Sequence, residues 1–146
     1  MYITIGVIAM DVDEVNDGIK EVDVLHDISN FQKKFNVSVT IEDLRNEFKK
    51  MDSFLKENAL EDDNPFFREF DIDRFGILIQ FQIVSLKDLE ILETNLLTIA
   101  KELSAIMQTE TILMIDDFKI PVALFKQGKL LDTFTKYSYV FWQKHS

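Results

Sequence analysis

The feature that most constrains the fold is an abrupt change of hydrophobic period at Ser85. Before it, residues 75–84 read FGILIQFQIV, and every second side chain from Ile77 to Ile83 is apolar. A period of two is typical of a β-strand with one face in the core. After it, apolar residues recur at helical spacing from Leu86 to Met107. The sequence therefore predicts a strand followed at once by an amphipathic helix that Ser85 caps and that lies across a sheet.

Three apolar segments follow this helix, at residues 111–115, 118–125 and 130–139. Asp116-Asp117 separates the first from the second, and Gln127-Gly128-Lys129 separates the second from the third. Short apolar segments joined by turns of two or three residues are the pattern of β-hairpins. We expect an antiparallel meander at the C-terminal end of the chain.

The N-terminal half predicts one strand and several helices. Residues 2–10 are rich in β-branched side chains, as in a strand. Helical spacing then runs from Val12 to Val22, breaks near Asp23, and resumes over 28–35. Thr40 and Asp43 resemble a capping box, which predicts a further helix to about residue 58. The predicted fold is α+β, a single domain over 1–146, with a mostly antiparallel sheet and helices on one face.

Composition excludes several kinds of protein. The 146 residues include no cysteine, four Gly and two Pro, and 47% are hydrophobic. The absence of cysteine excludes disulfide frameworks and thiolate catalysis, and so few Gly and Pro residues leave little room for long unstructured linkers. The first residues, MYITIGVIAM, lack a basic start and are followed by acidic residues, so they predict a buried strand rather than a signal peptide. No apolar run reaches the length of about 18–20 residues that a membrane helix needs. We expect a cytoplasmic protein without a membrane partner.

No constellation in the sequence predicts catalysis, a metal or a cofactor. Asp116-Asp117 resembles the acidic strand end that holds magnesium in two-component receiver domains. The companion residues and the alternating β/α order are missing, so a hairpin turn is the favoured interpretation. With two histidines and four glycines, the chain offers neither a Ser-His-Asp set nor a phosphate-binding loop. The run Asp11–Gly18 departs from calcium-loop spacing.

Residues 31–44, FQKKFNVSVTIEDL, superficially resemble a DNA-binding helix-turn-helix motif. The second helix of such a motif should carry basic or amide side chains to the groove, but this segment brings Glu42 and Asp43. DNA affinity depends largely on neutralising phosphates, and the surrounding half of the chain is acidic. We interpret the segment as a pair of packing helices and predict no nucleic-acid partner.

The negative charge of the chain is concentrated in its first half. Residues 1–74 hold 18 Asp and Glu against 9 Lys and Arg, a net charge of −9, whereas residues 75–146 hold 8 against 7, a net charge of −1. A strongly acidic surface attracts basic proteins and repels nucleic acid. Solvated carboxylates that only confer solubility are the alternative.

Two acidic clusters are the candidate contact sites for such a basic partner. The first comprises Asp11, Asp13, Glu14 and Asp17. From the second we expect contacts by Glu61, Asp62, Asp63, Phe66, Phe67, Asp71 and Asp73. Aromatic anchors surrounded by charges suit a protein-binding surface, because the rings are buried on binding and the charges speed association. Alternatively, the Phe rings face the core and only the carboxylates face water.

A small, cysteine-free, strongly acidic chain whose helices are followed by ETILMIDDFKIPVALFKQGKLLDTF resembles bacterial toxin-immunity proteins. The resemblance implies a non-enzymatic inhibitor that binds and neutralises a basic toxin domain, such as a nuclease, in the cell that makes it. It implies no individual site residues. Two alternatives stay open: a small enzyme that uses carboxylates or Mg²⁺, and a homo-oligomeric adaptor subunit. The sequence leaves the oligomeric state undetermined.

Overall fold

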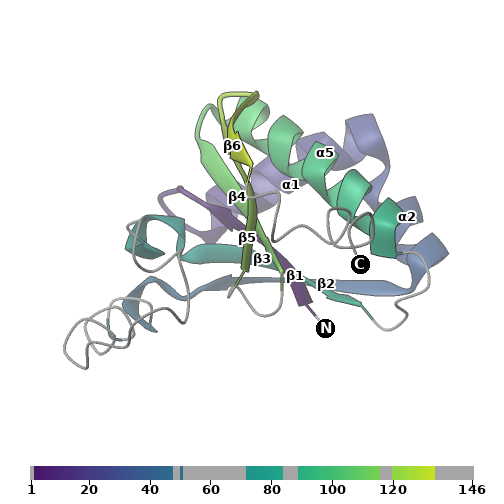
Figure 1. The fold of residues 1–146 in the computed structure, drawn as a ribbon, viewed down its shortest axis with the longest axis horizontal. Coiled ribbons are helices and arrows are strands. Elements are labelled where there is room, and N and C mark those ends of the chain that lie inside the picture. Colours follow the sequence, from purple (N-terminus) through teal and green to yellow (C-terminus); the bar gives the residue numbers. More distant parts are fainter. Residues whose placement is uncertain (1, 48–49, 51–71, 84–88, 116–119, 134–146) are drawn as a thin grey trace.

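The N-terminal strand β1 (Tyr2–Val7) lies inside the sheet, with β3 (Ile77–Ile83) on one side and β4 (Glu110–Ile115) on the other. In the computed structural model, which describes residues 2–47, 50, 72–83, 89–115 and 120–133, the strand order is β2-β3-β1-β4-β5-β6. Every neighbouring pair is antiparallel. The edge strands of this described sheet are β2 (Val37–Asp43) and β6 (Lys129–Thr133), and β5 (Ile120–Lys126) completes it (Figure 1).

Alternating side chains give the sheet two apolar faces of unequal size. The larger face includes Ile3, Ile5 and Val7 of β1 and carries α1 (Val12–His26), α2 (Ile28–Phe35) and α5 (Leu89–Met107) (Figure 1). The opposite face holds a smaller cluster around Leu78 and Met114, to which Phe75 of the 3-10 helix η1 (Ile72–Phe75) contributes. These observations confirm the predicted α+β class, in which α1, α2 and α5 share one face.

A single residue, Asp27, connects α1 to α2. Its backbone is left-handed, with φ of 51°. Its N–H donates to the Asp23 carbonyl at the end of α1 (2.8 Å), and its carboxylate accepts from the Asn30 N–H at the start of α2 (3.2 Å). Asp therefore ends one helix and caps the next, two uses that suit its short acceptor side chain. The prediction of two short helices is confirmed, with the break four residues later than expected.

Close packing joins α1 to α5. Gly18 is buried in α1, and a Cβ atom at this position would lie 2.8 Å from Met107 Sδ and 3.0 Å from Leu103 Cδ1 of α5. The Thr111 hydroxyl in turn donates to the Ala100 carbonyl (2.8 Å), which ties β4 to the same helix. The long helix predicted after β3 is thus present, with Leu92, Leu96 and Leu103 buried. Its predicted cap, Ser85, lies outside the described residues.

The helix predicted from Thr40 is wrong at its start, because residues 37–43 form strand β2. Asn36, with φ of 53°, ends α2 in a left-handed conformation. The chain then pairs with β3 in a register from Val37 opposite Ile83 to Asp43 opposite Ile77. β-branched residues alternate along β2, and pairing with a central strand outweighs a chance capping-box match. The predicted pair of packing helices over 31–44 is therefore a helix and a strand, and helical residues resume only at Arg45.

The C-terminal meander is confirmed for β4, β5 and β6. The strands β5 and β6 meet at a two-residue turn in which Gln127 and Gly128 both have positive φ, 49° and 82°. Positive φ at both central residues is the property of a type I′ hairpin turn, which favours Gly. β4 and β5 pair as far as Ile115 opposite Ile120. Asp116 and Asp117, predicted as the connecting turn, lie outside the described residues.

Candidate functional site

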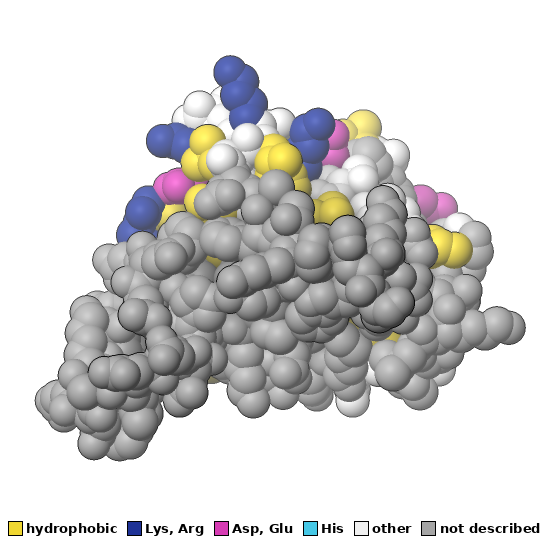
Figure 2. All heavy atoms as spheres, in the orientation of Figure 1, with side chains coloured by type: hydrophobic (Ala, Val, Ile, Leu, Met, Phe, Trp, Pro, Cys, Tyr) yellow, Lys and Arg dark blue, Asp and Glu magenta, His cyan; other side chains and the backbone are white. Residues whose placement is uncertain are grey.

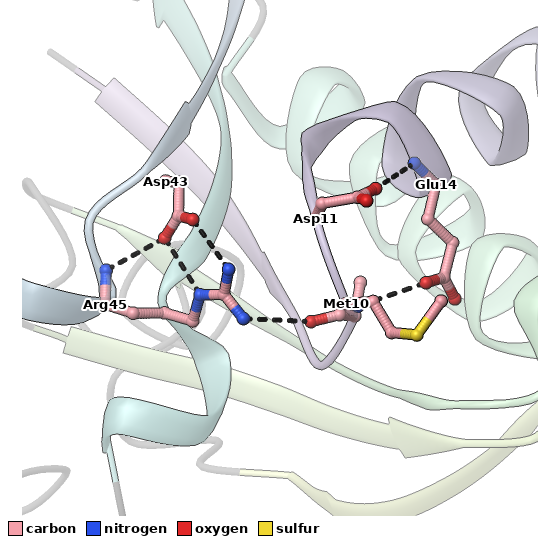
Figure 3. A network of polar contacts seen from close by, with 6 residues as sticks. Met10, Asp11, Glu14, Asp43 and Arg45 are labelled. Atoms are coloured by element: carbon pink, nitrogen blue, oxygen red, sulfur yellow. Dashed lines mark hydrogen bonds and ion pairs between the residues drawn. The ribbon is translucent and has the colours of Figure 1, made fainter.

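The first acidic cluster begins at the N-terminus of α1, where two of its members cap the helix. The Asp11 carboxylate accepts a hydrogen bond from the Glu14 N–H (2.9 Å). The Glu14 carboxylate in turn accepts from the Met10 N–H (3.0 Å), as Figure 3 shows. This reciprocal arrangement satisfies backbone donors around the first turn, in the manner of a capping box. Asp11 and Glu14 therefore have a structural role that requires no partner.

A bidentate ion pair lies next to this helix end. The Arg45 guanidinium donates to both Asp43 oxygens, at 3.0 Å from Nε and 2.7 Å from Nη2, and also to the Ala9 carbonyl at 3.5 Å (Figure 3). The hydrogen bond from Arg45 lowers the pKa of the Asp43 carboxyl. The same bond raises the pKa of Arg45, and the nearby charge of Asp11 adds to that rise. Arg45 thus offsets negative charge at this end of the molecule.

Three other acidic side chains of α1 lie on its solvent side. Asp13, Asp17 and Glu21 are exposed and follow one another at four-residue spacing, which places them on one face of the helix. Lys20 lies beside them. The opposite face of α1 is buried through Val15 and Val22. The helix is therefore held by its apolar face and presents a row of carboxylates to solvent.

This row ends in two exposed apolar side chains. Val24 is 86% exposed and Leu25 is 65% exposed. Val24 is seven residues after Asp17, so it continues the acidic row along the helix. We refer to Asp13, Asp17, Glu21, Val24 and Leu25 as the α1 ridge. It combines three carboxylates with an apolar end that the fold does not bury.

The structure describes five of the predicted contact residues. Asp13 and Asp17 belong to the α1 ridge, whereas Asp11 and Glu14 cap the helix. Asp73 lies in η1. The other predicted members of the second cluster lie outside the described residues: Glu61, Asp62, Asp63, Phe66, Phe67 and Asp71.

Phe75, next to that second cluster, is 2% exposed and belongs to the core, with the Arg74 guanidinium 5.9 Å from its ring centre. For this ring, the alternative that the Phe side chains face the core is the correct one. Its sequence position beside Asp71 and Asp73 therefore did not indicate an exposed anchor. The burial of Phe75 does not test Phe66 and Phe67, whose role as exposed anchors stays a prediction.

Sequence reasoning missed Val24 and Leu25. Their signal is visible in the helical spacing, because Val15 and Val22 define the buried stripe and Val24 falls about half a turn away from Val22. An apolar residue on the acidic side of an amphipathic helix is unusual enough to be noted. The break predicted near Asp23 hid this signal, because it placed Val24 and Leu25 between the two predicted helices.

Within the described ranges, no three His, Cys, Asp or Glu side chains are grouped so that they could hold a metal ion. No helix among the described residues is long and apolar enough to cross a membrane. Comparisons with models of protein families, with curated proteins and with solved structures found no match.

Proposed function

We propose that the protein is a non-enzymatic inhibitor of the immunity type, which binds and neutralises a basic toxin domain through the α1 ridge. The observation that supports this function is the combination of exposed carboxylates and exposed apolar side chains on one helix face. Asp13, Asp17 and Glu21 supply the charge, and Val24 and Leu25 supply the apolar contact.

The two parts of the ridge would act at different stages of binding. Carboxylates at the surface raise the rate of encounter with a basic protein and align it before contact. Burial of an exposed Val or Leu side chain then contributes roughly 1.5–3 kcal/mol each, before the entropic cost of association. Charge alone would bind any basic surface, so the apolar end gives the interaction its position along the helix.

A basic toxin domain is the partner class that fits this chemistry best. A toxin that acts on nucleic acid needs a basic cleft to hold phosphates. The same field attracts an acidic protein, so a helix edged with carboxylates can occupy the cleft and block the substrate. The net charge of −9 over residues 1–74 places the ridge within the acidic half of the chain.

Affinity capture of the partner from the cell of origin tests this function. The wild-type protein and an Asp13→Lys/Asp17→Lys variant would be used as baits in parallel, with the bound proteins identified by mass spectrometry. We expect the wild type to retain a basic toxin protein that the variant loses.

The matched control is Glu42→Lys/Glu47→Lys, which changes the net charge by the same amount at exposed positions outside α1. We expect this control to capture the same partner as the wild type. Capture of the same basic protein by all three baits would show that the ridge is not the binding surface. Capture of an acidic protein or of nucleic acid by the wild type would contradict the proposed partner class.

A further inference from the structure

A second exposed apolar surface lies at the edge strand β6. Leu130 is 55% exposed and Leu131 is 53% exposed. Lys126 and Lys129, on either side of the β5–β6 turn, are also exposed. Figure 2 shows Lys and Arg side chains gathered with hydrophobic ones, and some acidic ones, at the top of the view, where Figure 1 labels β6. We refer to Lys126, Lys129, Leu130 and Leu131 as the β6 corner.

The β6 corner is fixed to the helix α5. The Gly128 N–H donates to the Ser104 hydroxyl (3.0 Å), and a Cβ atom at Gly128 would lie 3.0 Å from Ala105 Cβ. One helical turn before Ala105, Lys101 is exposed and adds a third positive charge to this region. The corner is therefore a defined surface with a rigid support.

The β6 corner and the α1 ridge lie on opposite sides of α5. The helix α1 packs against α5 and β2, whereas β6 packs against β5 and α5 at the other end of the sheet. Two surfaces placed in this way cannot meet within one molecule, but each is open to a second copy. A contact between two different surfaces is head-to-tail, so it leaves one free ridge and one free corner on each pair.

The two surfaces are complementary in charge and alike in their apolar content. The α1 ridge has three carboxylates beside Val24 and Leu25, and the β6 corner has two ammonium groups beside Leu130 and Leu131. At an ionic strength near 0.15 M, the overall repulsion between two acidic molecules is screened beyond about 8 Å, while groups in contact still attract. Pairing them buries four apolar side chains that the monomer leaves in water.

We propose that the β6 corner of one copy docks on the α1 ridge of a second copy, so that the protein associates head-to-tail. The inference uses the same ridge as the proposed function but does not depend on the identity of the partner. Because both contacts need the ridge, a basic partner competes with self-association. In an associated pair, the apolar ridge of one copy is thus covered by the β6 corner of the other until the partner displaces it.

Sedimentation equilibrium over a concentration series at 0.15 M salt tests the inference. We expect the average mass of the wild type to rise above the monomer mass of 17.1 kDa with concentration. The variant Lys126→Glu/Lys129→Glu, altered only in the corner, should associate at least tenfold more weakly. So should the ridge variant Asp13→Lys/Asp17→Lys. Thermal unfolding of each variant verifies that it is folded.

A mixing experiment distinguishes head-to-tail docking from other modes of association. The acidic corner variant carries a native ridge, and the basic ridge variant carries a native corner, so an equimolar mixture should regain pairs that neither variant forms alone. The control Lys33→Glu/Lys50→Glu makes the same charge change at exposed positions of α2 and of the segment after β2, and should associate like the wild type.

A wild type that stays monomeric up to millimolar concentration would overturn the inference. So would variants that show no recovery on mixing, because a symmetric contact between two β6 edges gives that result. The corner variant should bind the basic partner as the wild type does. Loss of self-association with retained partner binding therefore supports this inference independently of the proposed function, whereas unchanged self-association of the corner variant would refute it.

Discussion

Two fully buried threonines show how a single hydroxyl group affects this fold. Thr111 donates to the Ala100 carbonyl at 2.8 Å and connects β4 to α5. The Thr4 hydroxyl, on β1, has no hydrogen-bond partner among the residues that the structure describes. A buried polar group without a partner loses its hydration and gains nothing in return, whereas a paired one contributes about 1 kcal/mol. The same side chain is thus unfavourable at one position and favourable at the other.

Replacing each threonine by valine, which has nearly the same shape, should have opposite effects. We expect Thr4→Val to raise the free energy of unfolding by up to about 1 kcal/mol. Thr111→Val should lower it by about 1 kcal/mol, since the hydrogen bond to Ala100 is lost. Urea unfolding of the two variants and the wild type measures both changes. A loss of stability in Thr4→Val equal to that in Thr111→Val would show that the Thr4 hydroxyl is paired.

At Asp11, the contribution of helix capping to stability can be measured separately from that of the negative charge. Its carboxylate accepts from the Glu14 N–H, a role that Asn performs equally well at a helix N-cap. We expect Asp11→Ala to lower the free energy of unfolding by about 1 kcal/mol. Asp11→Asn should leave stability nearly unchanged, although it removes the same charge. Thermal unfolding compares them, and equal losses in the two variants would mean that the charge, not the cap, stabilises α1.

The ion pair between Asp43 and Arg45 predicts a specific dependence of stability on pH. The hydrogen bond from Arg45 lowers the pKa of the folded Asp43 below its usual value of about 4. The pair therefore stabilises the fold above about pH 4, and this contribution is lost as the pH falls through the lowered folded pKa. The two side chains are 38% and 36% exposed, so solvent screening limits the contribution to about 0.5 kcal/mol.

We expect Asp43→Asn to be about 0.5 kcal/mol less stable than the wild type at pH 7. The two proteins should approach each other in stability in acid, as the pH falls through the lowered folded pKa and the wild-type carboxyl takes up its proton. Urea unfolding at pH 7 and in acid measures the difference. A difference that is the same at pH 7 and in acid would assign the effect to packing rather than to ionisation.

At the scale of elements, the start of β3 depends on a close approach between two backbone segments. The Leu44 N–H donates to the Gly76 carbonyl at 2.7 Å. A Cβ atom at Gly76 would lie 2.7 Å from Arg45 Cα and 2.9 Å from Arg45 N. Backbone atoms cannot move aside as the end of a side chain can, so residue 76 must lack a side chain for the end of β2 to pair with the start of β3.

Gly76→Ala should lower the free energy of unfolding by roughly 1–3 kcal/mol, the usual cost of a forced contact in a packed interior. Gly18→Ala is the matched control, because the atoms nearest to its new Cβ belong to the flexible Met107 side chain and the Leu103 methyl group rather than to backbone. Higher helix propensity partly offsets that contact. Gly76→Ala should therefore be the less stable of the two in urea unfolding. The reverse order would contradict the role of the close approach at β3.

Local patterns in the sequence predicted most elements but not their arrangement. The alternating run at β3 and the helical runs at α1, α2 and α5 are strong periodic signals, and each element is present. The second half of β2 was predicted as the start of a helix, because Thr40 and Asp43 match a capping box while the pairing with β3 involves residues about 40 positions away. The central place of β1 between β3 and β4 likewise rests on long-range contacts that no local period encodes.

The candidate site was only partly predictable for a similar reason. Acidic residues at positions 11, 13, 14 and 17 are evident in the sequence, but all four carry the same formal charge. Only the structure separates Asp11 and Glu14, which cap α1, from Asp13 and Asp17, which face solvent. Val24 and Leu25 became recognisable once α1 was seen to continue to His26. Whether an acidic or apolar side chain of this segment is available to a partner depends on its position on α1.

For the molecule as a whole, the distribution of charge is the property on which the proposed function depends most. The first half of the chain has a net charge of −9 and the second half −1. On the described surface, this asymmetry becomes an acidic α1 ridge on one side of α5 and a basic β6 corner on the other. An inhibitor of a basic partner would use the first surface, and association with a second copy would use both.

The central claim is tested most directly by titrating the captured partner with three proteins. These are the wild type, the ridge variant Asp13→Lys/Asp17→Lys and the control Glu42→Lys/Glu47→Lys. We expect the ridge variant to bind at least tenfold more weakly at 0.15 M salt, equivalent to about 1.4 kcal/mol, with a weaker salt dependence than the wild type. The Glu42/Glu47 control should stay within about threefold of the wild type, because rim and remote charges contribute little. Equal affinity of the ridge variant and the wild type would contradict binding through the α1 ridge.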